Sequence, residues 1–217
     1  SLFVLRLFND CVQSFVMYVS VLAFARNRWT AGCVALSLSV GIKMNSLLYS
    51  PGVLILLLQA RGIRGAFVRV ALCGVIQVLL GAPFLLHHPV SYLTRAFELS
   101  RVFLHKWSVN GAWISEKVFI SKPLAIFLLL MHVSALVFFA QSRWMAHALK
   151  RGGFKWIQPH RQLPADYIVS VLFTCNMIGL TFARTIHYQF YAWYFHTLPY
   201  LLSQSALPLP LQPAIFL

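Results

Sequence analysis

The stretch AFVRVALCGVIQVLLGAPFLL, residues 66–86, decides the fold class, because it carries a single charged side chain, Arg69. A second run of the same kind, KPLAIFLLLMHVSALVFFAQ, occupies residues 122–141. An α-helix needs about 20 consecutive, mainly apolar residues to cross the hydrocarbon core of a bilayer. Both runs reach that length, so the sequence predicts an all-α, polytopic membrane protein.

Composition supports this class. Of 217 residues, 59% are hydrophobic and 10% are charged, whereas a soluble domain carries about 25% charge. The formal charge of +14 comes from 18 Lys and Arg against 4 Asp and Glu. Because the basic residues flank apolar runs, we expect a lipid bilayer with anionic headgroups or phosphates as partner, and no nucleic acid. The histidines and cysteines have no metal-ligand spacing, so neither a metal site nor a cofactor is predicted.

Seven apolar segments can be marked along the chain. Only the fourth and fifth are long enough to span. The second and third are short, so either their helices extend into flanking polar residues or the pair dips into the membrane and returns. The segments are residues 11–25, 30–42, 47–59, 66–86, 122–141, 166–183 and 189–203.

The basic residues of the connections predict the orientation. The connections on one side contain Arg26, Arg28, Arg61, Arg64 and the basic 142–165 loop. The short connections on the other side are poorer in Lys and Arg, which makes the first side cytosolic. The opposite, non-cytosolic face then carries Arg6 to Asp10, Lys43 to Asn45, the 87–121 loop and Arg184 to Gln189.

The 87–121 loop is predicted to contain an ordered helix. Apolar residues recur at helical spacing over residues 89–104, and Arg95, Glu98 and Arg101 are spaced by three. This pattern is typical of an amphipathic helix lying in the membrane interface, with its arginines at phosphate level. A lid packed on the membrane domain fits the same pattern, and the two descriptions are compatible.

The stretch RTIHYQFYAWYFHTLP, residues 184–199, places an arginine, a histidine and a glutamine at the mouth of an apolar segment. Such groups are costly there unless they bind something polar. We interpret the stretch as a binding site for a phosphorylated lipid headgroup. The alternative is an interfacial belt, in which Tyr and Trp only anchor a helix end.

Five motifs in this chain resemble one enzyme family, in the expected order from about Arg6 to Leu202. The motifs are RLFND (6–10), KMN (43–45), APFL leading into YLTRAFELSRVF (82–85 and 92–103), WSVN (107–110) and HYQFYAWYFHTLP (187–199). The family that they resemble is that of the dolichyl-phosphate-mannose-dependent alpha-1,3-mannosyltransferases of the endoplasmic reticulum membrane, which act in protein N-glycosylation. After Asn110 the chain departs from the family pattern, since Gly111 and Ala112 precede Trp113 where a tryptophan is expected directly.

The resemblance implies a GT-C type fold and an inverting transfer in the lumen. Mannose would pass from dolichyl-phosphate-mannose to a pentamannosyl dolichol-pyrophosphate oligosaccharide, without an obligate protein partner. The family's catalytic aspartate is expected N-terminal to this chain, so these residues alone are expected to be inactive. Asp10 is given a supporting role at most, with helix capping or pairing as the alternative.

The resemblance also implies substrate-binding roles for the polar motif residues. Arg184 would bind the phosphate through two parallel N–H donors of its planar guanidinium. His187 would stabilise the departing phosphate or position a sugar hydroxyl. Lys43 either approaches the same cavity or extends to the interface. The complete predicted substrate-binding set is Arg184, His187, Tyr188, Gln189, Trp193, Lys43, Asn45 and Arg101.

Residues 1–203 are assigned to a partial membrane domain of this type, and residues 204–217 to an atypical proline-rich tail. Two other function classes remain open from the residues alone. A mannosyltransferase of glycolipid-anchor synthesis carries a similar aromatic element. A multi-pass transporter should show an internal repeat and ionisable groups at mid-membrane, whereas this sequence shows no internal repeat and its acidic residues avoid the segment centres.

Overall fold

The computed structural model describes residues 8–96, 105–146, 157, 161–206 and 208, and these residues form helices and turns without a β-strand. The predicted all-α class is therefore confirmed. Two helical stretches, Met44–His87 and Lys122–Trp144, are long and apolar enough to cross a membrane, and three shorter apolar helices accompany them. These helices fit a membrane protein, but seven separate spans are not seen in the described residues.

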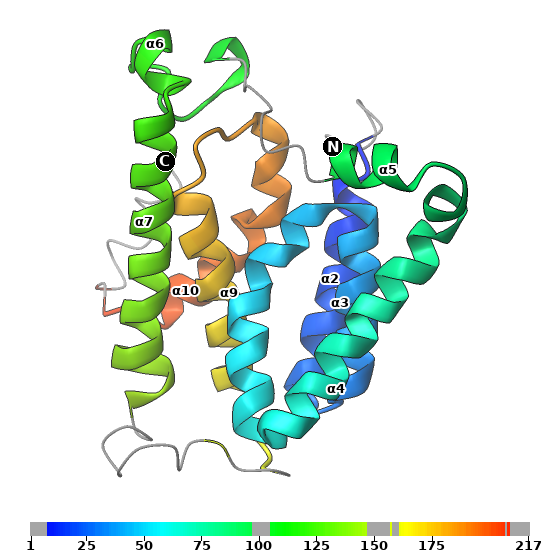
Figure 1. Cartoon of the computed structure of the whole chain (residues 1–217). Coiled ribbons are helices and arrows are strands. Elements are labelled where there is room, and N and C mark those ends of the chain that lie inside the picture. The colour runs from blue at the N-terminus through cyan, green and yellow to red at the C-terminus, as the bar shows by residue number, and fades with distance from the viewer. Residues whose placement is uncertain (1–7, 97–104, 147–156, 158–160, 207, 209–217) are drawn as a thin grey trace.

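The first two helices form an antiparallel hairpin. Helix α2 (Asp10–Ala25) runs to a turn in which Asn27 has a φ of 56°, and α3 (Trp29–Ile42) returns beside it (Figure 1). Buried serines join the pair: Ser20 Oγ donates to Gly32 O at 2.7 Å, and Ser39 Oγ donates to Gln13 O at 3.0 Å. At 14 residues, α3 is about 21 Å long. This length is well below the thickness of a hydrocarbon core of about 30 Å.

A short 3₁₀ turn, η1 (Met44–Tyr49), leads into α4 (Ser50–His87), which bends sharply at Gly62. Gly62 has a φ of 68° and a ψ of −178°, a combination open essentially to glycine alone. The two arms, 50–61 and 63–87, run in opposite directions and form a V in Figure 1. The third and fourth predicted segments are thus two arms of one bent helix.

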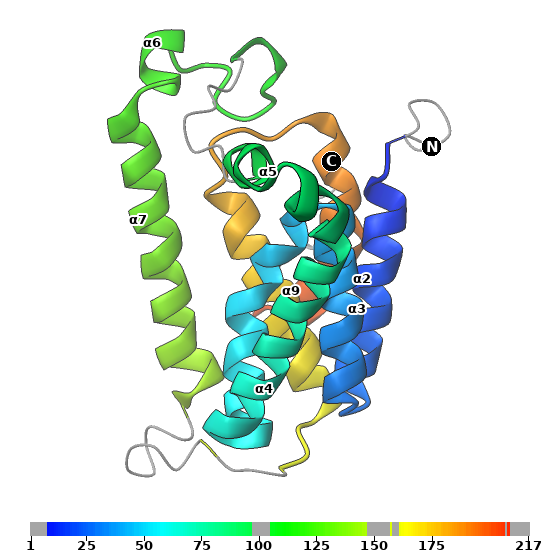
Figure 2. The same ribbon diagram turned by 45° about the vertical axis from the view of Figure 1, so that its right-hand side comes forward.

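Helix α7 (Lys122–Phe139) stands at the side of the bundle and continues into a π-helical turn, η3 (Ala140–Trp144) (Figure 2). It has no buried side chain. Helix α9 (Ala165–Thr181) lies centrally and packs on α2, η1 and the first arm of α4. The core therefore lies where α2, α3, the first arm of α4 and α9 meet, and it includes Phe24, Trp29, Leu56, Ile168 and Leu172.

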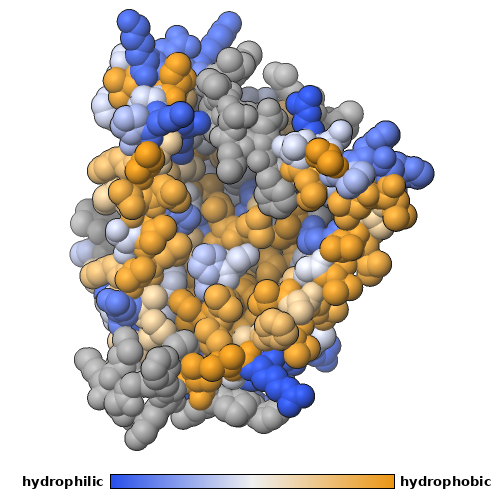
Figure 3. Space-filling view, viewed as in Figure 1, coloured by the Kyte–Doolittle hydropathy of each residue, from blue (hydrophilic) through white to orange (hydrophobic). Residues whose placement is uncertain are grey.

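The outer surface fits a lipid environment. Figure 3 shows hydrophobic residues over most of α7 and α4, with hydrophilic residues gathered mainly toward the upper and lower ends. Leu79, Leu86, Phe67 and Phe138 are among the large exposed hydrophobic side chains. Water would penalise so large an apolar surface, whereas a bilayer does not.

The last predicted segment, 189–203, is not one helix. It is divided into two 3₁₀ turns, η5 (Tyr188–Trp193) and η6 (Phe195–Thr197), followed by the short helix α10 (Leu198–Ser203). Pro199 lies at the start of α10 and lacks the N–H that a continuous helix would need there. The seventh apolar segment therefore forms short helical pieces in place of one continuous helix.

The connections gather at two opposite ends of the bundle, as predicted. At one end Asn27 bonds to both backbone groups of Leu163, and Gln59 Nε2 donates to Trp144 O at 3.0 Å. At the other end lie the start of α2, the turn after α3, and η5, which share direct contacts.

The 87–121 loop is ordered in its described parts. Helix α5 (Pro89–Ala96) covers the first half of the predicted amphipathic helix, and its Tyr92 stacks on Phe84 with ring centroids 5.6 Å apart. A 3₁₀ turn, η2 (His105–Trp107), and the short helix α6 (Glu116–Phe119) follow. Glu98 and Arg101 lie outside the described residues.

The four cysteines are free. Cys33 and Cys175 are buried, Cys73 is half-buried, and Cys11 is exposed on α2.

Candidate functional site

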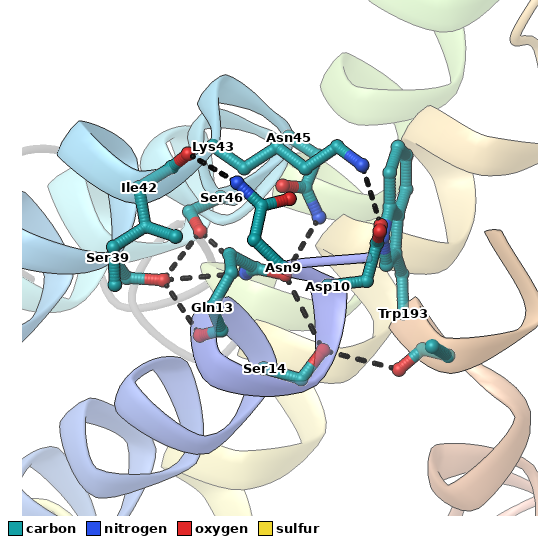
Figure 4. Close-up of polar contacts among 11 residues, drawn as sticks. Asn9, Asp10, Gln13, Ser14, Ser39, Ile42, Lys43, Asn45, Ser46 and Trp193 are labelled. Carbon is teal, nitrogen blue, oxygen red and sulfur yellow. Dashed lines mark hydrogen bonds and ion pairs between the residues drawn. The ribbon is translucent and has the colours of Figure 1, made fainter. Parts of the chain in front are cut away.

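A buried carboxylate organises one end of the bundle (Figure 4). Asp10 lies in the first turn of α2 and is 2% exposed. Its Oδ1 accepts hydrogen bonds from Lys43 Nζ at 2.6 Å and from the indole Nε1 of Trp193 at 2.5 Å. Because these three residues come from α2, the turn after α3, and η5, the carboxylate joins three separate parts of the chain.

Lys43 neutralises this carboxylate while it keeps access to the surface. Its side chain is 25% exposed, against 3% for that of Asp10. Its ammonium also lies 5.2 Å from the ring centroid of Trp193, a cation–π distance. The structure therefore pairs Lys43 with Asp10, whereas the sequence left open whether the Lys43 side chain approaches the substrate cavity or extends to the membrane interface.

Trp193 is enclosed by partners. It is 8% exposed, its ring stacks on Phe190 with centroids 3.8 Å apart, and its backbone oxygen accepts from Asn176 Nδ2 at 3.1 Å. A ring in this position offers no open face on which a sugar could stack. The indole instead orients the Asp10 carboxylate.

A polar network continues beneath the ion pair. Gln13 is 1% exposed; its Nε2 donates to Ser46 Oγ at 2.6 Å and to Ser39 Oγ at 3.3 Å. Its Oε1 accepts from Asn45 Nδ2 at 3.1 Å, which ties the predicted site residue Asn45 to α2. Sequence reasoning missed Gln13, although it follows Asp10 by three positions and so shares its helix face.

Two buried oxygens of this network have no hydrogen-bond partner within the described part of the chain: Asp10 Oδ2 and Asn45 Oδ1. Buried polar atoms are nearly always paired in folded proteins. Both atoms are acceptors, so a group that satisfies them must bring hydrogen-bond donors.

The predicted phosphate-binding residues lie on the segment that leads to Trp193. Residues 183–187 form neither helix nor strand, with a bend at Arg184, and the side chains of Arg184, His187 and Gln189 are partly buried. The His187 ring lies 5.5 Å from Phe190, which in turn stacks on Trp193. This chain of rings brings His187 to the same end as the Asp10–Lys43 pair.

Of two further predicted residues, one is exposed and the other lies outside the described residues. Tyr188 is 41% exposed, and its ring lies 6.2 Å from that of Phe8. Arg101 lies outside the described residues, so the structure does not place it. Thus Arg184, His187, Tyr188, Gln189, Lys43 and Asn45 come from two segments, 43–45 and 184–189, that meet at the start of α2.

Besides Asp10, two acidic residues are described. Asp166 lies in the first turn of α9 at the opposite end, and Glu116, which is exposed, begins α6. Among the residues that the structure describes, no three His, Cys, Asp or Glu side chains could hold a metal ion. The arrangement is one buried ion pair beside an irregular segment that carries an arginine and a histidine, which suits the binding of an uncharged polyol next to an anion.

Comparison with known proteins gives one family. The family model described as ALG3 protein matches residues 1–217. A Dictyostelium discoideum relative is named "Probable Dol-P-Man:Man(5)GlcNAc(2)-PP-Dol alpha-1,3-mannosyltransferase"; it is 45% identical over 208 residues, which cover 93% of this chain and 46% of the relative. Relatives from Mus musculus and Arabidopsis thaliana bear the same name without "Probable". The mouse protein is 47% identical over 93% of this chain and 47% of its own length, and the plant protein 41% identical over 100% and 53%.

The chain spans about half the length of the curated relatives that it matches. No solved structure matches it.

Proposed function

Because the chain belongs to the ALG3 protein family, we propose that it forms part of an alpha-1,3-mannosyltransferase that uses dolichyl-phosphate-mannose. The acceptor is the pentamannosyl dolichol-pyrophosphate oligosaccharide of protein N-glycosylation. The observation that carries this proposal is the match of the whole chain to one family, with relatives of that one name at 41–47% identity.

Arg184 and His187 bind the donor phosphate in this proposal. A guanidinium makes two parallel hydrogen bonds to a phosphate, which fixes the direction of the anion as well as its position. Arg184 is partly buried at a bend, where a charge-assisted bond is less weakened by water than on an open surface. His187 lies three residues further along and supplies a ring N–H to a phosphate oxygen or a sugar hydroxyl.

Lys43, Asn45, Tyr188 and Gln189 bind sugar hydroxyls. The Lys43 ammonium is already neutralised by Asp10 at 2.6 Å, so the pair favours a neutral polyol over a second anion. Hydroxyl groups bring the donors that the buried acceptor oxygens of Asp10 and Asn45 lack. Arg101 is assigned to phosphate binding on the sequence pattern alone.

The reaction is a single displacement at the sugar carbon. The acceptor oxygen bonds to that carbon while the bond to the phosphate oxygen breaks, and dolichyl phosphate departs with the electron pair. A carboxylate takes the proton of the acceptor hydroxyl. Asp10 Oδ1 accepts hydrogen bonds from Lys43 and Trp193, so Asp10 is assigned to orienting these two side chains, with its Oδ2 left to accept from a sugar hydroxyl, and the proton is taken by a different carboxylate.

The site faces the lumen of the endoplasmic reticulum, and the chain passes about seven times through or into its membrane. Support comes from the basic residues Arg26, Arg28, Arg61, Arg64 and Arg143, which belong to the end opposite the site. Residues 1–203 form the membrane domain in this proposal, and residues 204–217 form a tail.

A chimaeric enzyme tests the function. The chain replaces the matching half of the Dictyostelium relative, and membranes lacking endogenous activity are supplied with dolichyl-phosphate-mannose and the lipid-linked acceptor. We expect one added mannose, released by an alpha-1,3-specific mannosidase. Transfer of a different linkage, or none by a chimaera that is folded and inserted, would contradict the proposal.

A further inference from the structure

The segment between α9 and η5 lacks a backbone hydrogen-bonding pattern of its own. Residues 183–187 are neither helical nor extended in a sheet, yet Thr185 within it is 6% exposed. Buried backbone groups need partners, so the conformation of such a segment is set by whatever contacts it from outside.

The side chain of Asn110 makes that contact. Its Nδ2 donates to Ala183 O at 2.7 Å, and its Oδ1 accepts from Ile186 N at 2.6 Å. One amide thus bridges the backbone on both sides of Arg184 and Thr185. The backbone adds a third bond, from Val109 N to Ile186 O at 2.7 Å.

Asn110 is itself fixed by its neighbours. Ser108 Oγ donates toward Asn110 Oδ1 at 2.9 Å and Asn110 O at 2.7 Å. The chain then turns away at Gly111, whose φ of 69° favours glycine. The His105 ring bonds to Gly111 O at 3.3 Å. The departure from the family motif after Asn110 is therefore a tight turn that leaves the amide facing the 183–186 backbone.

We propose that Asn110 is a positioning residue for the phosphate-binding segment: its amide fixes the backbone at Arg184, and thereby the direction of the guanidinium and of His187. The inference rests on the proposed function, because it assumes that Arg184 binds the donor phosphate. An amide is required, since one end donates to Ala183 and the other accepts from Ile186.

The chain offers a matched control at the opposite end of the bundle. Asn27 bridges a backbone in the same way: its Nδ2 donates to Leu163 O and its Oδ1 accepts from Leu163 N, both at 3.0 Å. Asn27→Gly removes those two bonds without strain, because Asn27 has a φ of 56°. Asn110→Ala removes the two bonds beside Arg184.

The experiment measures binding of citronellyl phosphate, a short polyprenyl phosphate, to the detergent-solubilised chain by equilibrium titration, together with the melting temperature. We expect Asn110→Ala to weaken binding about ten- to hundredfold, because loss of one well-placed hydrogen bond from the guanidinium to the phosphate lowers affinity by about that factor. Asn27→Gly should lower the melting temperature comparably and leave the affinity unchanged. If both variants weaken binding equally, or neither does, Asn110 is a structural residue only and the inference is wrong.

Two more variants separate the possible failures. If Asn110→Ala does not fold, Ser108→Ala, which removes only the bonds that hold Asn110, should still weaken binding severalfold; unchanged affinity there would overturn the inference. Arg184→Lys tests the assumption beneath it. If Arg184→Lys weakens binding and the Asn110 and Ser108 variants do not, this inference fails while the phosphate site stands. If Arg184→Lys leaves the affinity unchanged, both fail together.

Discussion

Replacing Asp10 by leucine should destabilise the protein more than any exposed substitution, because it leaves two donors without their acceptor. Lys43 Nζ and Trp193 Nε1 both donate to Asp10 Oδ1, and the carboxyl side chain is 3% exposed. Removing one partner of a buried ion pair costs about 3–5 kcal/mol. Since the Lys43 side chain is 25% exposed, water recovers part of that loss, and we expect about 3 kcal/mol.

The measurement is the melting midpoint in detergent, followed by circular dichroism. A loss of about 3 kcal/mol corresponds to a midpoint about 6–12 °C lower for a chain of this size. The double variant Asp10→Leu/Lys43→Met removes the stranded ammonium as well, so it should melt above the single variant. What remains is the unpaired indole N–H, which costs about 1–3 kcal/mol.

Asp166→Asn is the control, because Asp166 is an exposed acid in the first turn of α9. Its midpoint should change by no more than about 1–2 °C. The reasoning is refuted if Asp10→Leu melts within about 2 °C of the wild type, or if the double variant melts below the single one.

Three further predictions concern the indole, the bend and the sidedness. Trp193→Phe keeps the stack on Phe190 but loses the indole N–H. The melting midpoint should therefore fall by about 2–4 °C, equivalent to roughly 1 kcal/mol. A fall as large as that of Asp10→Leu would show that the ring contact contributes more to stability than the hydrogen bond to Asp10. Gly62→Ala places a side chain at a φ of 68° and should cost about 1–3 kcal/mol in a denaturant titration, whereas a neutral result would show that the bend relaxes. Sidedness is tested by placing one cysteine at Ser115, which precedes α6, and another at Gln162, beside the Asn27–Leu163 bonds. In sealed microsomes an impermeant reagent should label the cysteine at position 162 from the cytosol and the cysteine at position 115 only from the lumen. The reverse labelling would contradict the luminal placement of the site.

The helices themselves were predictable, because apolar length and the positions of arginine decide them locally. The bend of α4 falls where Arg61 and Arg64 interrupt the apolar run, so two segments were marked where one bent helix exists. The grouping of the connections at two ends was predictable because successive apolar segments alternate in direction. Pro199 in the last segment was visible in the sequence. Whether it ends the helix depends on which neighbouring groups can bond to the backbone atoms that lose their helical partners, and the sequence does not show those neighbours.

The contacts of the site were not predictable from local pattern. Asp10 bonds across 33 residues to Lys43 and across 183 residues to Trp193, and no periodicity links such positions. Trp193 was included in the predicted substrate-binding set because a sequence does not show whether a tryptophan is buried or exposed. Arg184 and His187 could be selected because polar groups at a helix mouth are costly without a ligand.

The most direct test of the proposed site is the mannose transfer rate of the chimaera with Arg184→Lys, relative to the unsubstituted chimaera at equal abundance. Lysine keeps the charge and loses the planar fork. Loss of one well-placed, charge-assisted contact in a transition state costs about 2–4 kcal/mol, so the rate should fall roughly a hundredfold or more. A rate near that of the unsubstituted chimaera would show that Arg184 does not bind the donor phosphate, and the segment from Arg184 to Gln189 would then be an interfacial anchor.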